Sequence, residues 1–189
     1  MQKGKRGAIE LSIGTIVVIV LAMSMLILGL VLVRQIFSGA TSIADMTNEQ
    51  VKNQVAAMFG SDKKLVVYPD SKRIEVSQGE INGFGIGLKN LVEGSSESIK
   101  FSYEVVVSDP DLRKKCDVSE TEAEGWITTG RAEDNIPIAP GDFMSTKVLF
   151  NIPVGASLCT LRYRVNVYMG AGQQQPYATD IMDVTIKAG

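Results

Sequence analysis

The sequence of 189 residues contains no histidine. Histidine is the commonest general base in enzymes, the usual zinc ligand and the middle member of Ser-His-Asp and Cys-His catalytic sets. Its absence weighs against every class of enzyme or metal site that depends on imidazole. Paired carboxylates or a lysine nucleophile remain chemically open, but the sequence marks no such site. We therefore expect a protein that is not an enzyme and that carries neither a cofactor nor a metal.

The sequence also lacks a concentration of basic residues. Its formal net charge is −2, and residues 60–189 carry fourteen Lys and Arg against eighteen Asp and Glu. A mildly acidic body without a basic face gains no free energy from counterion release on a phosphate backbone. We therefore expect no nucleic-acid partner.

An acidic stretch over residues 109–124 does not have the form of a calcium site. Its spacing departs from the Asp-x-Asp-x-Asp-Gly pattern, and Arg113-Lys114-Lys115 lies among the acids. The more ordinary interpretation is a solvated, variable loop, because charge runs are usually solvent-facing. The acidic residues are Asp109, Asp111, Asp117, Glu120, Glu122 and Glu124. Trp126, which follows them, is expected to anchor the core.

What the sequence does contain is one long apolar run. Residues 11–33 carry no charge over twenty-three positions, which as a helix would be about 34 Å long, against about 30 Å for the hydrocarbon core of a bilayer. Lys3, Lys5 and Arg6 precede the run, whereas Arg34 is the only close charge after it. This asymmetry predicts a single-pass membrane precursor with a cytoplasmic N-terminus and an extracellular C-terminal domain.

Two ordinary interpretations compete with any special role for this run. A cleaved secretory signal typically has an apolar region of about 7–15 residues and ends at an Ala-x-Ala site. Here the run is longer, and Arg34-Gln35-Ile36-Phe37 follows it. A plain signal anchor that never assembles is the stronger competitor.

The residues before the run carry a resemblance. Lys5-Arg6-Gly7-Ala8-Ile9-Glu10, followed directly by the apolar run, resembles the class III signal peptide of archaeal type IV pilins and archaellins. In that family a prepilin peptidase cuts before the helix, typically after a glycine. The resemblance implies Gly7 and Ala8 as the processing site, a basic leader over 1–7, and a transmembrane or assembly helix over 8–38. It also implies a membrane assembly platform as a partner.

The position of Glu10 departs from one feature of related filaments. Bacterial-type pilins usually carry this glutamate as the fifth mature residue, whereas a cut after Gly7 makes Glu10 the third. A carboxylate in lipid can be offset by a neighbouring subunit's amino terminus, or it can simply favour the start of a helix in the headgroup region. Both interpretations stay open. Gly14 and Gly29 are candidate assembly positions, because small residues allow helices to approach closely.

A connector helix is expected over residues 39–60. Thr47 and Gln50 have capping-box spacing, apolar residues such as Val51 and Val55 follow at helical intervals, and Gly60 is placed to end the helix. The helix either packs on the globular body, as the stem does in the resembled family, or forms a free amphipathic stalk.

Residues 61–189 change to the alternating pattern of β-strands. Strong turn signals separate the apolar segments, without helical patterns between them. Glycines at 83, 85 and 87 suggest a bulge or a sheet edge. The expected strands are 65–68, 73–76, 84–92, 99–107, 148–152, 161–167 and 182–186. The predicted fold is α+β: a long N-terminal helix followed by an immunoglobulin-like sandwich ectodomain of about seven strands.

Only two cysteines are present, Cys116 and Cys159. Both lie outside the cell in the predicted topology, where thiols are usually oxidised, so we expect them to form a disulfide. A metal site built from two cysteines without histidine is much less probable on ligand chemistry.

These observations and the resemblance together favour a structural subunit of an extracellular type IV pilus-like filament. Copies of the chain would assemble through the N-terminal helix, with membrane lipid as the partner before assembly and the sandwich on the outside. The alternative is a non-assembling, signal-anchored cell-surface binding or scaffold protein. Cleavage after Gly7 and filament formation separate the two hypotheses.

Overall fold

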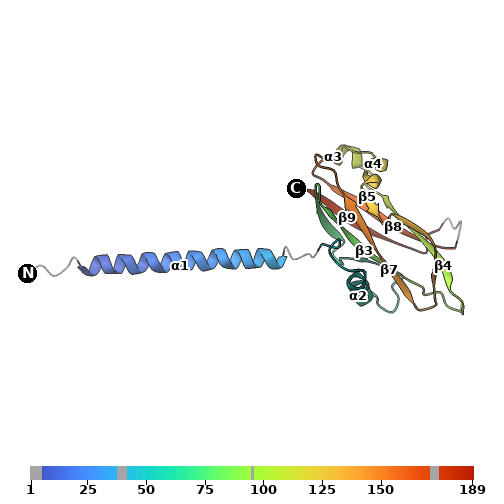
Figure 1. Ribbon diagram of the computed structural model, residues 1–189, viewed down its shortest axis with the longest axis horizontal. Coiled ribbons are helices and arrows are strands. Elements are labelled where there is room, and N and C mark those ends of the chain that lie inside the picture. The colour runs from blue at the N-terminus through green and yellow to red at the C-terminus, as the bar shows by residue number, and fades with distance from the viewer. Residues whose placement is uncertain (1–5, 38–41, 95, 171–174) are drawn as a thin grey trace, which may run out of the picture. The chain divides into compact units, whose positions relative to one another are not determined.

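The computed structural model divides the chain into two compact units, residues 1–41 and 42–189. It describes residues 6–37, 42–94, 96–170 and 175–189 (Figure 1). Most of the expected leader, residues 1–5, and the first residues of the expected connector therefore lie outside the described residues.

The first unit is a single helix, α1, from Arg6 to Phe37. It is 32 residues long and contains the whole apolar run, so the continuous apolar sequence without an internal proline or charge forms one uninterrupted helix. The sequence placed this helix at 8–38.

The second helix, α2, runs from Asn48 to Met58. The Thr47 side chain accepts a hydrogen bond from the Gln50 backbone N–H at 3.2 Å, and the Gln50 side chain accepts one from the Thr47 N–H at 2.7 Å. This capping box fixes the start of the helix as the sequence predicted. The helix ends at Met58, and Phe59 is the C-cap in extended conformation, so the chain leaves the helix just before Gly60.

Within the described residues, the second unit is a two-layer sandwich of nine strands. The strands are β1 (Leu65–Tyr68), β2 (Arg73–Ser77), β3 (Ile81–Lys89), β4 (Ile99–Val107), β5 (Ile127–Thr129), β6 (Ala132–Ile138), β7 (Phe143–Asn151), β8 (Thr160–Met169) and β9 (Ala178–Lys187). One sheet has the order β1-β3-β7-β5 and the other has the order β2-β9-β8-β4-β6. All neighbours are antiparallel except β2 and β9, which are parallel.

The order β1-β3-β7 matches immunoglobulin strands A, B and E, and the order β9-β8-β4 matches strands G, F and C. The chain departs from that arrangement at β5 and β6. Strand β5, which pairs with β7, comes before β6, which pairs with β4, whereas in an immunoglobulin domain the strand beside C comes before strand D. The sequence-based expectation of a β-sandwich is therefore met, but its count of about seven strands was too low.

The two strands absent from that expectation are β5 and β6. Strand β5 has only three residues, and β6 (AEDNIPI) begins with four exposed residues that include three polar ones and contains Pro137. Proline and charged residues are tolerated at a sheet edge, where one side of the strand needs no partner. Edge position therefore explains why the alternating apolar pattern is missing.

Two short helices interrupt the stretch between β4 and β5, which was expected to be a loop. They are α3 (Leu112–Cys116) and α4 (Glu120–Gly125). Leu112, Cys116 and Ala123 are buried. The expectation of a solvated, variable loop was wrong for these three residues, because each helix turns one apolar side toward the core.

The glycines of β3 do not mark a bulge or an edge. Strand β3 lies between β1 and β7, and its register with β7 is continuous from Ile81 to Lys89. A Cβ at Gly85 would lie 2.9 Å from Val51 Cγ1, and one at Gly87 would lie 2.1 Å from Val55 Cγ1. Gly85 and Gly87 are therefore needed for the close approach of α2 to the outer face of this sheet.

The main core lies between the two sheets. Phe84 and Phe150 of one sheet contact each other, with ring centroids 5.8 Å apart, and Phe150 contacts Tyr163 of the other sheet at 4.9 Å. Trp126 belongs to this core and is 6% exposed, in agreement with its expected role as an anchor. A second, smaller cluster beneath α2 consists of Ile43, Met46, Val51, Val55 and Val66.

Candidate functional site

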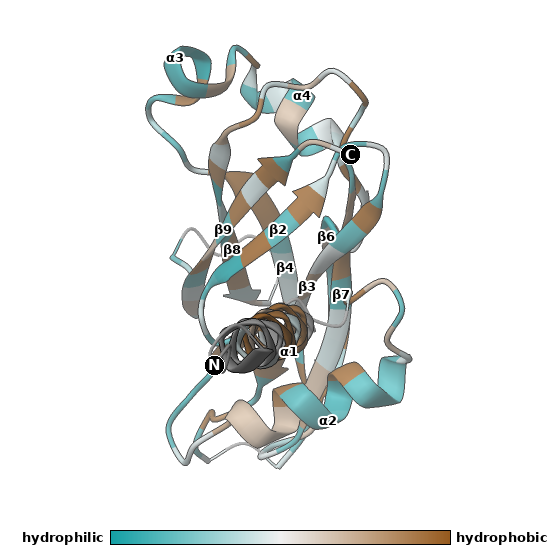
Figure 2. Cartoon of the chain, turned by 90° about the vertical axis from the view of Figure 1, so that its left-hand side faces the viewer, coloured by the Kyte–Doolittle hydropathy of each residue, from teal (hydrophilic) through white to brown (hydrophobic). Residues whose placement is uncertain are grey.

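The feature with the clearest functional meaning is the apolar helix α1. Residues Gly14–Leu32 form a 19-residue segment with a mean hydropathy of 2.9, of which none is buried within the chain. The large side chains of this segment are 49% to 76% exposed. In Figure 2 the helix is seen nearly end-on, and the visible coloured part of it is brown, the hydrophobic end of the scale. Such a surface is stable only against lipid or against other apolar surfaces.

Small residues of α1 share one side of the helix with larger ones. At 100° per residue, Gly14, Val18, Ala22, Met25 and Gly29 fall on a common stripe. Glycine has no side chain, so a neighbouring helix can approach closely at both glycine positions.

The expected processing residues lie at the start of α1. Gly7, Ala8 and Glu10 are helical, but their side chains are not among those that the structure describes. The pairing of Glu10 with a neighbour's amino terminus thus stays a prediction.

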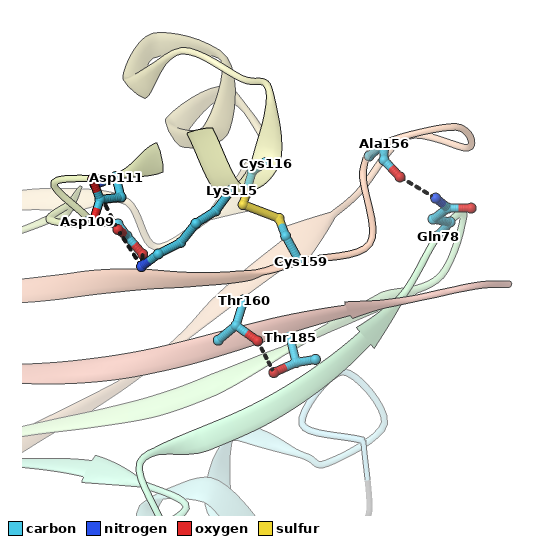
Figure 3. Close-up of a disulfide and its surroundings, with 9 residues drawn as sticks. All are labelled: Gln78, Asp109, Asp111, Lys115, Cys116, Ala156, Cys159, Thr160 and Thr185. Carbon is cyan, nitrogen blue, oxygen red and sulfur yellow. Dashed lines mark hydrogen bonds and ion pairs between the residues drawn. A yellow bond between two sulfur atoms is a disulfide. The ribbon is translucent and has the colours of Figure 1, made fainter. Parts of the chain in front are cut away.

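The disulfide links the α3 segment to the main sandwich (Figure 3). Cys116, the last residue of α3, is bonded to Cys159, just before β8, and their Cα atoms are 5.5 Å apart. The Cys159 carbonyl also accepts a hydrogen bond from the Ile186 N–H at 2.8 Å, which ties the second cysteine to β9. The pairing is the one that the sequence predicts.

Ion pairs surround the disulfide on its β8 side. Lys115 Nζ contacts Asp109 Oδ1 at 3.1 Å, and Arg162 donates to both oxygens of Asp183, at 2.8 and 3.1 Å. The hydrogen bonds from Arg162 lower the pKa of Asp183. A shallow groove lies between these pairs and Leu158. Each charge already has an opposite partner, so the groove offers no net field for a charged ligand.

The acidic residues do not gather into a metal site. Among the described residues, no group of three or more Cys, Asp or Glu is arranged to hold a metal ion. Asp109 is buried against Lys115, and Glu124 contacts Arg131 at 2.8 Å while accepting a hydrogen bond from the Val107 N–H. Two of these acids therefore hold the helical segment to the sandwich.

A polar contact fixes the place where the chain enters the sandwich. The Asn82 side-chain oxygen accepts hydrogen bonds from the Ser42 hydroxyl and from the Ile43 N–H, both at 3.1 Å. The same oxygen accepts from the Gly83 N–H at 2.8 Å. Asn82 carries no sequence signal of its own, since its role depends on a partner forty residues earlier.

Comparison with known proteins places the chain in no family. No protein-family model matches it, and no curated protein matches it. Among solved structures, E. coli alpha-2-macroglobulin is similar with 7% identity and a TM-score of 0.42, over 66% of this chain and 7% of that one. The CARDB domain of PF1109 from Pyrococcus furiosus, solved with di-metal ions, is similar with 12% identity and a TM-score of 0.38, over 66% and 94%.

A third similar structure is the calcium-binding domain CBD12 of CALX1.1. It has 14% identity and a TM-score of 0.36, over 65% of this chain and 45% of that one. Resemblances at this level assign neither a ligand nor an activity to the chain. The functional argument therefore rests on its own residues.

Proposed function

We propose that the chain is a structural subunit of an extracellular type IV pilus-like filament. The observation that carries the proposal is the 19-residue apolar segment of α1, which is exposed along its whole described length and precedes a folded sandwich. The class III-like sequence Lys5 to Glu10 stands directly before the run. A processed helix of this kind is held by lipid first and by other copies of itself after assembly.

Assembly would exchange lipid contacts of α1 for contacts with identical helices. The small residues Gly14 and Gly29 would allow a neighbouring helix to approach closely. A repeating contact between different surfaces of identical subunits builds an open fibre when its rotation does not close into a ring. The apolar stems would form the fibre core and the sandwiches its outer layer.

The sandwich is suited to an outer layer. It holds a disulfide, which persists in oxidising surroundings outside the cytoplasm. Its own core is closed between the two sheets and beneath α2. The sandwich therefore needs no contact with α1 to bury its apolar residues.

The first experiment is intact mass and N-terminal sequencing of the protein from native membranes and from sheared surface material. We expect a mature N-terminus at Ala8 and processed protein in the sheared fraction. Retention of Met1 with all protein in the membrane would overturn the proposal and would favour the signal-anchored surface protein.

A second experiment tests the assembly role of Glu10. If Glu10 pairs with a neighbouring amino terminus, Glu10→Gln should leave the protein in the membrane fraction but deplete it from the sheared fraction by tenfold or more. Glu49→Gln is the matched control, because Glu49 lies in the first turn of α2 and is exposed. Equal shedding of both variants would show that Glu10 only favours the start of the helix.

A further inference from the structure

The two cysteines of the disulfide differ in their exposure to solvent. Cys116 is 1% exposed and belongs to the main core. Cys159 is only partly buried and packs against that core. Cys159 also lines the groove beside the ion pairs, whereas Cys116 does not. A reagent that arrives from solvent therefore meets the bond on its Cys159 side.

The groove is wide enough and electrically neutral enough to admit a thiol. Its volume of about 600 Å³ is within the range of small-molecule sites, about 300–1,000 Å³. The paired charges on its walls are Lys115 with Asp109 at 3.1 Å and Arg162 with Asp183 at 2.8 Å. A thiolate that enters the groove therefore meets no uncompensated negative charge on these walls.

The backbone holds the two cysteines in different ways (Figure 3). The Cys159 carbonyl accepts a hydrogen bond from the backbone of β9 at 2.8 Å. Cys116 ends α3, whose Leu112 is buried and whose Lys115 pairs with Asp109. Segment α3 thus keeps contacts with the sandwich that do not depend on the disulfide. Because the two Cα atoms are 5.5 Å apart, the two sulfur atoms stay close together when the bond between them opens.

We infer that Cys159 is the sulfur through which this bond exchanges with a dithiol or disulfide of another molecule, and that Cys116 is the resolving sulfur. In reduction, a thiolate of the other molecule attacks Cys159 Sγ, the bond to Cys116 breaks, and Cys116 leaves as a thiolate that takes a proton from water. The second thiolate of the other molecule then attacks its own bonded sulfur and releases Cys159. The other molecule ends as a disulfide, and the two electrons have passed to the cysteines.

Oxidation follows the same sulfur atoms in the opposite direction. The Cys159 thiolate attacks the disulfide of the other molecule and forms a mixed disulfide with it. The Cys116 thiolate then attacks Cys159 Sγ and expels the other molecule, which ends as a dithiol with the two electrons. The resolving step is favoured by proximity, because Cys116 is already beside its target.

The partner that fits this site is a protein with a reactive dithiol or disulfide, in a compartment where disulfides are formed. The exchange site lies wholly in the second unit. It depends neither on filament assembly nor on cleavage before α1, so its failure would leave the proposed function untouched.

The test uses the full-length chain in detergent with its disulfide intact, and reduced glutathione as the probe. The reaction is stopped with acid after short times, free thiols are blocked with a maleimide, and the modified peptides are identified by mass spectrometry. We expect glutathione on Cys159 with maleimide on Cys116, in about tenfold or greater excess over the reverse product, because access decides which sulfur is attacked.

Two results would overturn the inference. The first is an equal mixture of the two products or an excess of glutathione on Cys116. The second is the absence of both products from the folded protein under conditions that give both in guanidinium, since the bond would then be closed to thiols from solvent.

A pair of variants tests the groove as the route to Cys159. Leu158 and Val154 are 61% and 82% exposed in the same loop, but only Leu158 lines the groove. Leu158→Trp should slow the attack of glutathione by roughly threefold or more by filling the groove, and Val154→Trp should react at the wild-type rate. All three proteins should react alike in guanidinium. Equal rates for the two folded variants would refute the groove as the route.

Discussion

Gly87 shows how a single absent side chain controls the docking of a helix. A Cβ at this position would lie 2.1 Å from Val55 Cγ1 and 3.0 Å from Phe59 Cε2. Val55, on the inner side of α2, is completely buried. The outer face of β3 is thus shaped for α2, and any side chain at Gly87 has to displace the helix.

We therefore predict that Gly87→Ala lowers the free energy of unfolding by about 1–3 kcal/mol through overpacking. Guanidinium unfolding of the detergent-solubilised chain, followed by the emission of its single tryptophan, measures this loss. Gly60→Ala is the matched control, since its Cβ would make only an ordinary contact of 3.6 Å with Asp62. An equal loss in both variants would contradict the docking argument.

Tyr163 makes the stability of the sandwich depend on pH in the alkaline range. Its hydroxyl donates to the Ala123 carbonyl at 2.8 Å, and burial raises its pKa, with a smaller contribution from Glu124. Below about pH 10 the tyrosine is protonated in both states. Above that pH the unfolded chain loses the proton and the folded chain keeps it, so the free energy of unfolding falls as pH rises.

Tyr163→Phe tests this dependence. Loss of the hydrogen bond to Ala123 should lower the free energy of unfolding of the variant by about 1 kcal/mol at neutral pH. Between pH 9 and pH 11, its free energy of unfolding should fall less steeply than that of the wild type. A residual slope is expected from Tyr103, whose pKa is also raised by burial. Parallel curves for the two proteins would refute the role of Tyr163.

At the scale of elements, the sequence predicts a helix or strand well when neighbouring residues determine it, and poorly when distant residues do. Strand β4 alternates buried and less buried residues, and the Thr47–Gln50 capping box needs only neighbouring residues, so both can be read locally. The sequence-based expectation of a bulge or an edge was wrong because the partner of Gly85 and Gly87 is α2, which is distant in the sequence. Strand β6 was missed because an edge strand with exposed polar residues has no apolar alternation.

The candidate site also has one part that neighbouring residues predict and another part that they do not. The apolar run and its basic flank are contiguous, so the sequence alone predicts α1 and its orientation. The contact at Asn82 depends on segments that meet only in the folded chain, so no local pattern marks it.

The disulfide is the main covalent constraint on α3 and α4. It closes a loop with a sequence separation of 43, and the chain-entropy model gives about 4 kcal/mol for a loop of that size. Cys116→Ala with Cys159→Ala should therefore lower the free energy of unfolding by about this amount. Reductant should lower the free energy of unfolding of the wild type to that of the double variant and should leave the double variant unchanged. A double variant whose stability still responds to reductant would contradict the assignment of the effect to this disulfide.

At the scale of the whole molecule, the basic flank predicts orientation. Replacing Lys3, Lys5 and Arg6 by Gln leaves Arg34 as the nearest basic residue to the apolar run and should retain the sandwich in the cytoplasm in part of the molecules. Protease added to intact cells should then digest less of the sandwich than in the wild type. Arg34→Gln is the control and should keep full accessibility. Unchanged digestion of the triple variant would show that the flank does not set the orientation.

The order of attachments along the chain also determines how the subunit would respond to a pulling force. Load applied through the stem reaches the Asn82 contact first and the packing of α2 second, before it reaches the hydrogen bonds of β1. Unravelling residues 43–64 would lengthen the connection by up to roughly 70 Å, while the sandwich and its disulfide remained folded. The docked helix is therefore an extensible element, which in the proposed filament would let the fibre stretch before any of its outer domains unfolds.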